Sequence, residues 1–526
     1  MTILPTRLDP ARTAQLYTNG FWRHETLADI AARRVAEAPD RVIVTDGDRV
    51  LTRRELLELA AALAGSLRGL GIQPGDSIGF QLPNWWEACV INLAAALGGY
   101  VVVPLLPIFG RAELADITRR TQTKLLFVPE EFRGTPHLQI ARDALPDVEI
   151  VQVRGQQGGQ RRFEEMLDTA PVIAPAEPDA VKLILFTSGS TGRPKGVLHT
   201  HNTIHALSRY CEENWEMGPA DVLFVPSSVA HIGGSIYAFE MPWIIGCSAL
   251  LMDRWQADAA VALINQHDAT FCAAATPFLR ELIVAARAAR THLPGLRRFI
   301  CGGASVSSGL IEEAAEEFPN AVVSRAYGST EVPTLAPGIR NRDDVWACAH
   351  TDGQVRTELR LLDNGEIVAR APQMFMGYLD APDNDGVFTE DGYFRMGDLG
   401  RVIDGKYIEV IGRTKDIIIR AGENLSPREV ENCLLTHPAI RDIAIVGVPD
   451  TKTGEAAFAF VQCRAGERVT LADLAAHIAA AGLAKQKIPE YLLVVEDLPM
   501  STVGKVRKDM LRTQAPELRE KAEARR

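Results

Sequence analysis

A segment rich in glycine and hydroxyl side chains follows an apolar run and carries groups that could bind phosphate. It reads Leu183-Ile-Leu-Phe-Thr-Ser-Gly-Ser-Thr-Gly-Arg-Pro-Lys-Gly-Val197. Backbone N–H groups near the glycines, the hydroxyls and Lys195 could together wrap a polyphosphate. A Walker A loop needs Gly-Lys-Ser/Thr, whereas here Pro194 precedes Lys195 and Gly196 follows it. An ordinary hairpin turn is the alternative interpretation.

Further short motifs follow this segment in a fixed order. They are Gly302-Gly303-Ala304, Tyr327-Gly328-Ser329-Thr330-Glu331, Gly365-Glu366 through Met376-Gly377-Tyr378, Gly397-Asp398-Leu399, Gly412-Arg413-Thr414-Lys415-Asp416 and Gly504-Lys505. Together with the phosphate segment, this ordered set resembles the acyl-adenylate-forming superfamily, the AMP-dependent synthetases and ligases. The resemblance covers the chain from about residue 25 to about residue 510.

The resemblance implies an ATP site assembled from several motifs. The ring of Tyr327 offers a flat surface for the purine, and small residues at 302–304 let backbone approach its other face. Asp398 and Arg413 are expected to hold the ribose through its hydroxyls. Taken singly, Tyr327 could be a core aromatic and Asp398 a turn residue. The expected nucleotide-binding residues are Thr187, Ser188, Gly189, Ser190, Thr191, Gly192, Lys195, Gly302, Gly303, Ala304, Tyr327, Gly328, Asp398 and Arg413.

The same resemblance assigns metal and catalytic roles. The Thr330 hydroxyl is expected at the α-phosphate, and Glu331 with Thr187 is expected to bind a magnesium ion. Lys505 is expected to stabilise the charge that develops between the acid's carboxylate and the α-phosphate. Without the resemblance, Glu331 and Lys505 would be interpreted as solvated surface charges.

A hinge is implied at Lys415, which otherwise would be a solvated turn residue. The C-terminal domain first presents Lys505 for adenylate formation and then rotates so that a thiol can attack the adenylate. The loop that begins at Ile419 and contains Gly422 is expected to line the channel for the pantetheine arm of coenzyme A.

The acid is expected to bind near His231, which borders the acyl pocket in relatives but could also be a core histidine. Small neighbours leave room for an apolar group: Ser228, Ala230, Gly233 and Gly234. No acidic residue occurs from Val222 to Phe239, so a carboxylate for an amino acid's ammonium group is not evident. A simple carboxylic acid is favoured, and the overall pattern is most similar to ligases of medium-chain fatty and alicyclic acids.

The elements that must position these residues follow a β-α-β pattern. A strand at Ser77–Leu82, a helix at Trp85–Leu97 and a strand at Tyr100–Val103 form one such unit. Although Ala88 to Gly110 is free of charged residues, its turns favour a folded core over a membrane span. The pattern recurs over the first four hundred residues, which predicts an α/β fold with a large N-terminal domain of largely parallel sheets covered by helices.

The pattern of predicted secondary structure changes near residue 413, where short strands begin to alternate with helices. Lys415–Arg420 is predicted to form a strand, Ser426-Pro427 to open a helix and Leu471–Ala481 to form another. We therefore expect an N-terminal adenylation body at residues 1–413 and a small mobile α+β domain at residues 414–526.

Composition limits the function classes. The chain has 526 residues, 47% hydrophobic and 23% charged, which is typical of soluble globular proteins. Its net charge of −11 disfavours nucleic acid as a partner. Eight scattered cysteines and an N-terminus without a signal-peptide pattern favour the cytoplasm, with a homodimer left open.

Taken together, the sequence predicts an ATP- and Mg²⁺-dependent carboxylic acid:CoA ligase that works through an acyl-AMP intermediate. One alternative keeps adenylation but delivers the acyl group to a carrier protein or another acceptor. A nucleotide-binding regulator without catalytic activity is the non-enzyme alternative.

Overall fold

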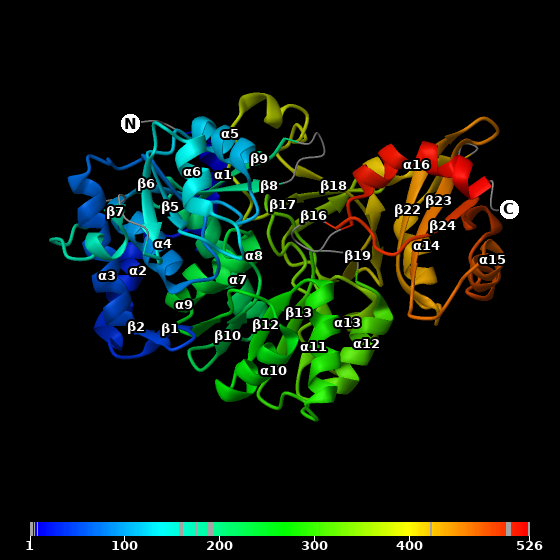
Figure 1. Cartoon of the computed structure of the whole chain (residues 1–526), viewed down its shortest axis with the longest axis horizontal. Helices are drawn as coiled ribbons and strands as arrows, with labels where there is room; N and C mark the ends of the chain where they lie inside the picture. Colours follow the sequence, from blue (N-terminus) through cyan, green and yellow to red (C-terminus); the bar gives the residue numbers. More distant parts are fainter. Residues whose placement is uncertain are drawn as a thin grey trace.

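The chain forms a large N-terminal body and a smaller C-terminal domain beside it (Figure 1). The computed structural model describes residues 4, 6–7, 9–156, 161–174, 176–187, 193–303, 306–420, 423–500 and 506–523. The expected α/β class, with a large N-terminal domain and a small C-terminal one, is confirmed.

Two seven-stranded sheets organise the N-terminal body. The first has the order β7-β6-β5-β3-β4-β8-β9 and is parallel except for the β8–β9 pair. Its strands are β3 (Ser77–Phe80), β4 (Val101–Pro104), β5 (Leu125–Pro129), β6 (Glu149–Val153), β7 (Arg161–Arg162), β8 (Val181–Thr187) and β9 (Lys195–Thr200).

The second sheet has the order β14-β13-β12-β10-β11-β1-β2 and is parallel except for the β1–β2 hairpin. Its strands are β1 (Val42–Asp46), β2 (Arg49–Thr52), β10 (Val222–Val225), β11 (Ser248–Leu251), β12 (Phe271–Ala274), β13 (Arg298–Cys301) and β14 (Val322–Arg325).

Three helical layers cover the faces of these sheets. The largest hydrophobic cluster joins both sheets through the helices between them: α2 (Leu27–Glu37), α3 (Arg53–Gly69), α4 (Trp86–Gly98), α7 (His201–Trp215) and α9 (Met241–Ile244). The outer face of the first sheet packs on α1 (Pro10–Thr18), α5 (Arg111–Thr121) and α6 (His137–Ala144). The outer face of the second packs on α10 (Ala257–Gln266), α11 (Thr276–Ala288), α12 (Ser308–Glu317) and α13 (Val345–His350).

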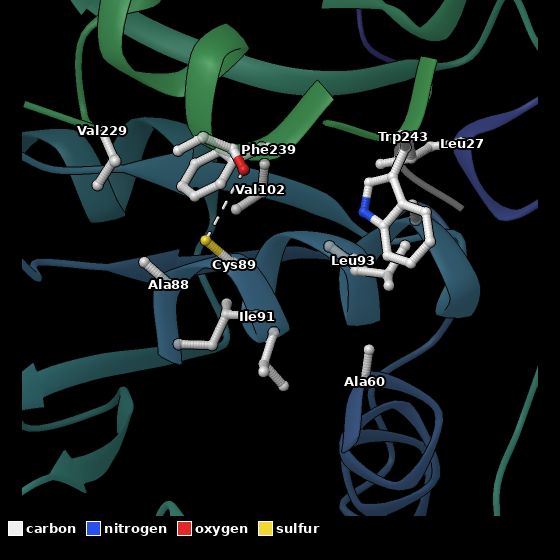
Figure 2. Packing of buried hydrophobic residues seen from close by; sticks show 14 of the residues in the cluster. Leu27, Ala60, Ala88, Cys89, Ile91, Leu93, Val102, Val229, Phe239 and Trp243 are labelled. Carbon is white, nitrogen blue, oxygen red and sulfur yellow. Dashed lines mark hydrogen bonds between the residues drawn. The ribbon is translucent and has the colours of Figure 1, made fainter. Parts of the chain in front are cut away.

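The central layer is apolar and tightly packed, as Figure 2 shows around Cys89 and Phe239. Helix α4 is buried on nearly every side, which explains its lack of amphipathic character. It ends at Gly99, whose φ of 69° is left-handed and suits glycine. The uncharged stretch is therefore core from Ala88 to Leu105, apart from the half-buried Gly99, whereas Ile108 near its end is exposed. No described helix is long and apolar enough to cross a bilayer.

A third sheet, of five strands, completes the N-terminal body and is wholly antiparallel. Its order is β15-β19-β18-β17-β16, with β15 (Gly353–Gln354), β16 (Glu358–Leu361), β17 (Glu366–Arg370), β18 (Phe394–Ile403) and β19 (Tyr407–Arg413). Between residues 353 and 413 no described α-helix is long enough for a parallel crossover, so neighbouring strands pair in opposite directions.

The C-terminal domain has its own sheet and two hydrophobic clusters. Its strands are β20 (Ile418–Arg420), β21 (Glu423–Leu425), β22 (Ile440–Asp450), β23 (Gly454–Cys463) and β24 (Tyr491–Val494), and its helices are α14 (Pro427–Leu434), α15 (Leu471–Ala480) and α16 (Lys508–Glu523). The predicted strand at 415–420 is wrong in its first half. Residues Thr414–Asp416 form a 3₁₀ turn, and Asp416 is held there by Arg512 at 2.6 Å.

Candidate functional site

The two ends of the phosphate segment face each other across a hairpin. Thr187 ends β8, Lys195 begins β9, and the two residues are direct partners in the antiparallel pairing. Residues Ser188, Gly189, Ser190, Thr191 and Gly192 lie outside the described residues. The segment thus joins two antiparallel strands, but seven residues separate Thr187 from Lys195, more than the two of a tight turn.

Lys195 points into a polar cluster at the start of β9. Its Nζ lies 3.3 Å from the Oδ1 of Asp383 and 4.8 Å from the ring centroid of Tyr378. The Tyr378 hydroxyl donates to the Oε1 of Glu331 at 2.7 Å. Burial and the Glu331 charge raise the pKa of this phenol, which therefore stays protonated and donates. Contacts thus run continuously from Thr187 to Glu331, the two expected metal ligands.

A buried arginine that the sequence did not single out holds the end of the phosphate segment. The Arg120 side chain is only 2% exposed, and its Nη1 donates to the carbonyl oxygen of Pro194 at 2.7 Å. The same guanidinium pairs with Asp380, which also lies 4.0 Å from Arg193. Arg120 and Asp380 therefore position the residues immediately before Lys195.

A buried histidine fixes the backbone next to Glu331. The Nε2 of His199 lies 2.8 Å from the carbonyl oxygen of Thr330, and a carbonyl only accepts, so Nε2 is the donor. Thr203 Oγ1 lies 3.1 Å from the other ring nitrogen. Burial lowers the pKa of His199 to about 4, so the ring is neutral at physiological pH.

The expected purine and ribose residues form one cluster. Asp398 on β18 and Arg413 on β19 are direct partners in the strand pairing, and Arg413 Nε lies 3.2 Å from Asp398 Oδ1. Tyr327 donates its hydroxyl to the other carboxylate oxygen at 2.8 Å. Burial and the Asp398 charge raise the pKa of Tyr327 and keep it protonated. The structure therefore brings these three residues together.

The glycines near this cluster have different structural roles. Gly303 has a φ of 81°, and a Cβ there would meet no atom within 4 Å, so it borders open space. A Cβ on Gly302 would lie 2.9 Å from the Ala326 carbonyl oxygen, and one on Gly328 only 2.4 Å from the Thr334 nitrogen. Gly302 and Gly328 therefore permit close backbone packing. Ala304 lies outside the described residues.

His231 caps the short helix α8 (Ile232–Ser235), where its carbonyl accepts from the Ser235 nitrogen at 2.8 Å. A Cβ on Gly233 would meet no atom within 4 Å, so this position opens onto free space. A Cβ on Gly234 would lie 2.0 Å from the Ser228 carbonyl oxygen. The smallness of Gly234 thus serves loop packing, not a pocket, which corrects the expectation for this residue.

Lys415 lies exposed in the turn Thr414–Asp416, at the point where the third sheet ends and the C-terminal sheet begins. The Thr414 hydroxyl donates to the Gly397 carbonyl oxygen at 3.0 Å, which ties this turn to the Asp398 strand. Gly422 and Lys505 lie outside the described residues.

Comparison with known proteins identifies the family. Residues 31–379 match the AMP-binding enzyme family, and residues 429–505 match the C-terminal domain of AMP-binding enzymes. The chain belongs to the AMP-binding enzyme family. In this AMP-binding enzyme, Tyr327, Asp398 and Arg413 form one of the groups that the resemblance assigned to the nucleotide, and Thr187 and Lys195 form another.

Similar proteins cover almost the whole of this AMP-binding enzyme. A medium-chain fatty-acid–CoA ligase of Escherichia coli (strain K12) is 34% identical over 95% of this chain and 92% of that protein. A 2,3-dihydroxybenzoate-AMP ligase of Bacillus subtilis (strain 168) is 31% identical over 96% of both. The structure of ATP-bound MatB from Rhodopseudomonas palustris has a TM-score of 0.82 at 25% identity, over 93% of this chain and 98% of that one. The protein is an adenylate-forming enzyme of the acid:CoA ligase family, for which ATP and Mg²⁺ are the cofactors and coenzyme A is the co-substrate.

The residues at the loop fit a magnesium ion bound together with a nucleotide. Tyr378 occupies only one oxygen of Glu331, and the remaining carboxylate oxygen is the hard ligand that Mg²⁺ prefers. Among the described residues, no three His, Cys, Asp or Glu side chains gather as metal ligands. A Mg²⁺ ion held by one carboxylate and by substrate phosphates needs no such group.

Proposed function

We propose that the protein joins a medium-chain fatty or alicyclic carboxylic acid to coenzyme A in two steps. A carboxylate oxygen attacks the α-phosphorus of ATP, and pyrophosphate leaves, giving an acyl-AMP. The CoA thiol then loses its proton and attacks the acyl carbon, and AMP leaves with the electrons of the broken C–O bond. The mixed anhydride makes a poor acyl donor reactive toward a thiol.

In this proposal the cluster around Asp398 holds the nucleoside. The Asp398 carboxylate accepts from the ribose hydroxyls while Tyr327 and Arg413 fix its orientation, and the Tyr327 ring contacts the purine. The Thr330 hydroxyl, with its backbone fixed by His199, donates to the α-phosphate. Lys195 and the segment from Thr187 to Gly192 hold the outer phosphates.

Glu331 and Thr187 would hold the magnesium ion, which supplies neutralisation of charge on the nucleotide oxygens when bound. The contribution of the protein is orientation, because the Tyr378 hydroxyl fixes one oxygen of Glu331 and leaves the other available. Without that hydrogen bond, the carboxylate could rotate away from the nucleotide.

Lys505 is the proposed adenylation lysine, and Lys415 the proposed hinge between an N-terminal body at 1–413 and a mobile domain at 414–526. The Lys505 cation would offset the repulsion between the acid's carboxylate and the α-phosphate. Rotation about Lys415 would then replace Lys505 by the loop that contains Gly422, which would contact the pantetheine arm.

The main support for a simple acid is that the first acidic residue after position 221 already has a partner within the protein. That residue is Glu240, and its Oε1 accepts from the buried Lys182 ammonium at 2.5 Å. Both side chains are almost fully buried, and Lys182 compensates the charge of Glu240 through Oε1. Oε2 of Glu240 has no hydrogen-bond donor among the described residues, but little net negative charge is left there for an amino acid's ammonium group. We place the acyl group near His231 and the open space at Gly233.

Pyrophosphate release over a panel of acids tests this proposal. The panel is hexanoate, octanoate, decanoate, cyclohexanecarboxylate, benzoate and phenylalanine. We expect kcat/KM for octanoate or cyclohexanecarboxylate to exceed that for phenylalanine by about 100-fold, since a charged ammonium would be buried without a partner. A preference for phenylalanine would contradict the proposal.

A side chain added at Gly233 tests where the acyl group lies. Gly233→Val should depress kcat/KM for decanoate much more than for hexanoate, because the new side chain fills the proposed acyl space. Gly309→Val is the matched control, since Gly309 is also helical and a Cβ there also meets no atom within 4 Å. Equal losses for both acids would contradict the placement.

A further experiment tests which thiol accepts the acyl group. Relatives include a salicyl-AMP ligase / salicyl-S-ArCP synthetase of Mycobacterium tuberculosis, which is 30% identical over 94% of this chain. Thioester formation should be compared with free CoA and with a phosphopantetheinyl carrier protein. We expect CoA to be the better acceptor, and exclusive transfer to the carrier protein would favour the alternative.

A further inference from the structure

The Lys195 ammonium, at the C-terminal end of the phosphate segment, contacts two side chains of the protein, those of Asp383 and Tyr378. Asp383 Oδ1 lies 3.3 Å from its Nζ, and the Tyr378 ring lies under it at 4.8 Å. The Lys195 and Asp383 side chains are 21% and 25% exposed, so solvent screens the pair only in part. A free lysine of this segment would sample many rotamers, whereas this one has a defined partner.

The position of Asp383 is itself fixed by the backbone around it. Asp383 belongs to the 3₁₀ helix Ala381–Asn384. The next residue, Asn384, accepts from the Tyr378 nitrogen at 2.8 Å and donates to the Tyr378 carbonyl oxygen at 3.0 Å. Tyr378 forms an isolated bridge with Val197 of β9, so the helix and the lysine strand are held in one register.

An aspartate at this place opposes polyanion binding unless its charge is compensated. A carboxylate beside a phosphate site repels the ligand, and a cation that is already paired attracts it less. Lys195 is the one lysine in the sequence of the phosphate segment, and its ammonium group carries a single positive charge. It cannot pair fully with the Asp383 carboxylate and with the phosphates at the same time. The two anions are therefore alternatives for one ammonium group.

We propose that Asp383 is the counter-ion of Lys195 in the nucleotide-free enzyme and that competition between Asp383 and the ATP phosphates for Lys195 limits ATP affinity. This inference rests on the proposed function, which places the phosphates at the segment that ends at Lys195. Asp383 is a positioning residue that acts through Lys195. Its loss tightens ATP binding, whereas loss of Lys195 weakens it.

The test is the Kd of Mg–ATP, measured by calorimetry without a carboxylic acid so that no turnover occurs. Asp383→Asn should bind Mg–ATP about two- to fivefold more tightly, the range expected for a partly exposed ion pair. Asp385→Asn is the matched control, because Asp385 is two residues away and exposed, and it reports the effect of merely removing a nearby negative charge. The effect at Asp383 should exceed the effect at Asp385.

A Lys195→Met background separates the counter-ion role from general charge repulsion. There, Asp383→Asn should change the Kd no more than Asp385→Asn does. An equal effect of Asp383→Asn with and without Lys195, or weaker ATP binding by Asp383→Asn, would overturn the counter-ion role. If Lys195→Met alone leaves the Kd unchanged, the proposed phosphate role of Lys195 fails as well, so the two failures are distinguishable.

A kinetic readout separates this role from a purely structural one. If Asp383→Asn strengthens ATP binding equally in the ground state and the transition state, the KM for ATP falls and kcat does not rise. A lower kcat with an unchanged KM would instead indicate misplacement of the catalytic groups and would overturn the proposal.

Discussion

The Tyr327 hydroxyl donates a hydrogen bond to Asp398 over 2.8 Å, although 71 residues separate the two in the chain. Arg413 binds the other oxygen of the same carboxylate. A tyrosine interpreted as a surface for the purine is thus also a direct partner of the carboxylate assigned to the ribose. In the proposed nucleotide site, base and sugar recognition would therefore share one hydrogen-bonded unit.

Removing only that hydroxyl should weaken ATP binding without removing the ring. Tyr327→Phe is expected to raise the KM for ATP about tenfold, the usual value of a hydrogen bond to a charged group. Combined with Asp398→Asn, the effect should be less than additive, since both changes break one interaction. Strict additivity in the double-mutant cycle would show that the two residues act independently.

Tyr378→Phe should change the magnesium requirement. Without its hydroxyl, Glu331 loses the partner that orients it, so the Mg²⁺ concentration for half-maximal pyrophosphate release should rise by about tenfold. The measurement is a Mg²⁺ titration at saturating ATP. Tyr393→Phe is a suitable control, because the Tyr393 hydroxyl donates to Glu358 and not to Glu331. An unchanged Mg²⁺ requirement for Tyr378→Phe would exclude the orienting role.

Arg120→Met should destabilise the body and disturb the phosphate segment. Deleting this buried cation leaves the Pro194 carbonyl without its donor and Asp380 with only the more distant Arg193, at a cost of about 3 kcal/mol. Denaturant midpoints and the KM for ATP measure the two effects. The neighbouring Arg119 has a 70% exposed side chain, so Arg119→Met should be nearly neutral. Equal effects of both variants would contradict the assignment.

Stability should fall as the pH decreases from about 6.5 toward 4. Burial lowers the pKa of His199 to about 4 and sets those of His201 and His205 well below 6.5, so the unfolded chain binds more protons in this window. His199 alone should cost about 3 kcal/mol at the acid end of the window. Urea midpoints measured against pH should vary less in His199→Gln, which keeps a donor for Thr330. His292→Gln, at an exposed histidine, should keep the normal pH dependence.

Residues whose partners are close in the chain, or whose motif is complete, could be predicted from the sequence. The helix predicted at Trp85–Leu97 is one example, since α4 spans Trp86–Gly98 and ends at the left-handed Gly99. Arg120 was missed because its acceptor Asp380 is 260 residues away. The one available signal was its place three residues after the buried Ile117, on the inner side of α5.

The start of the strand predicted at Lys415–Arg420 was wrong, and the antiparallel third sheet was not predicted. The run Ile417–Ile419 is β-branched and suggests a strand, but Asp416 is drawn into a turn by Arg512, 96 residues further on. Neighbouring strands can be parallel only if a crossover connection, usually a helix, joins them. The sequence between residues 353 and 413 contains several short elements, and the lack of a crossover helix among them is evident only from the structure.

The half-reactions of Lys505→Ala test the account most directly. We expect adenylation, measured as ATP–pyrophosphate exchange with octanoate, to fall by about 100-fold or more, because the carboxylate must then approach the α-phosphate without this cation. Thioester formation from supplied octanoyl-AMP and CoA should stay within about twofold of the unmodified enzyme, since that step does not use Lys505. Lys485→Ala, at an exposed lysine of the same domain, is the control. Equal loss of both half-reactions, or no loss of exchange, would contradict an adenylate-forming ligase that alternates between two domain orientations.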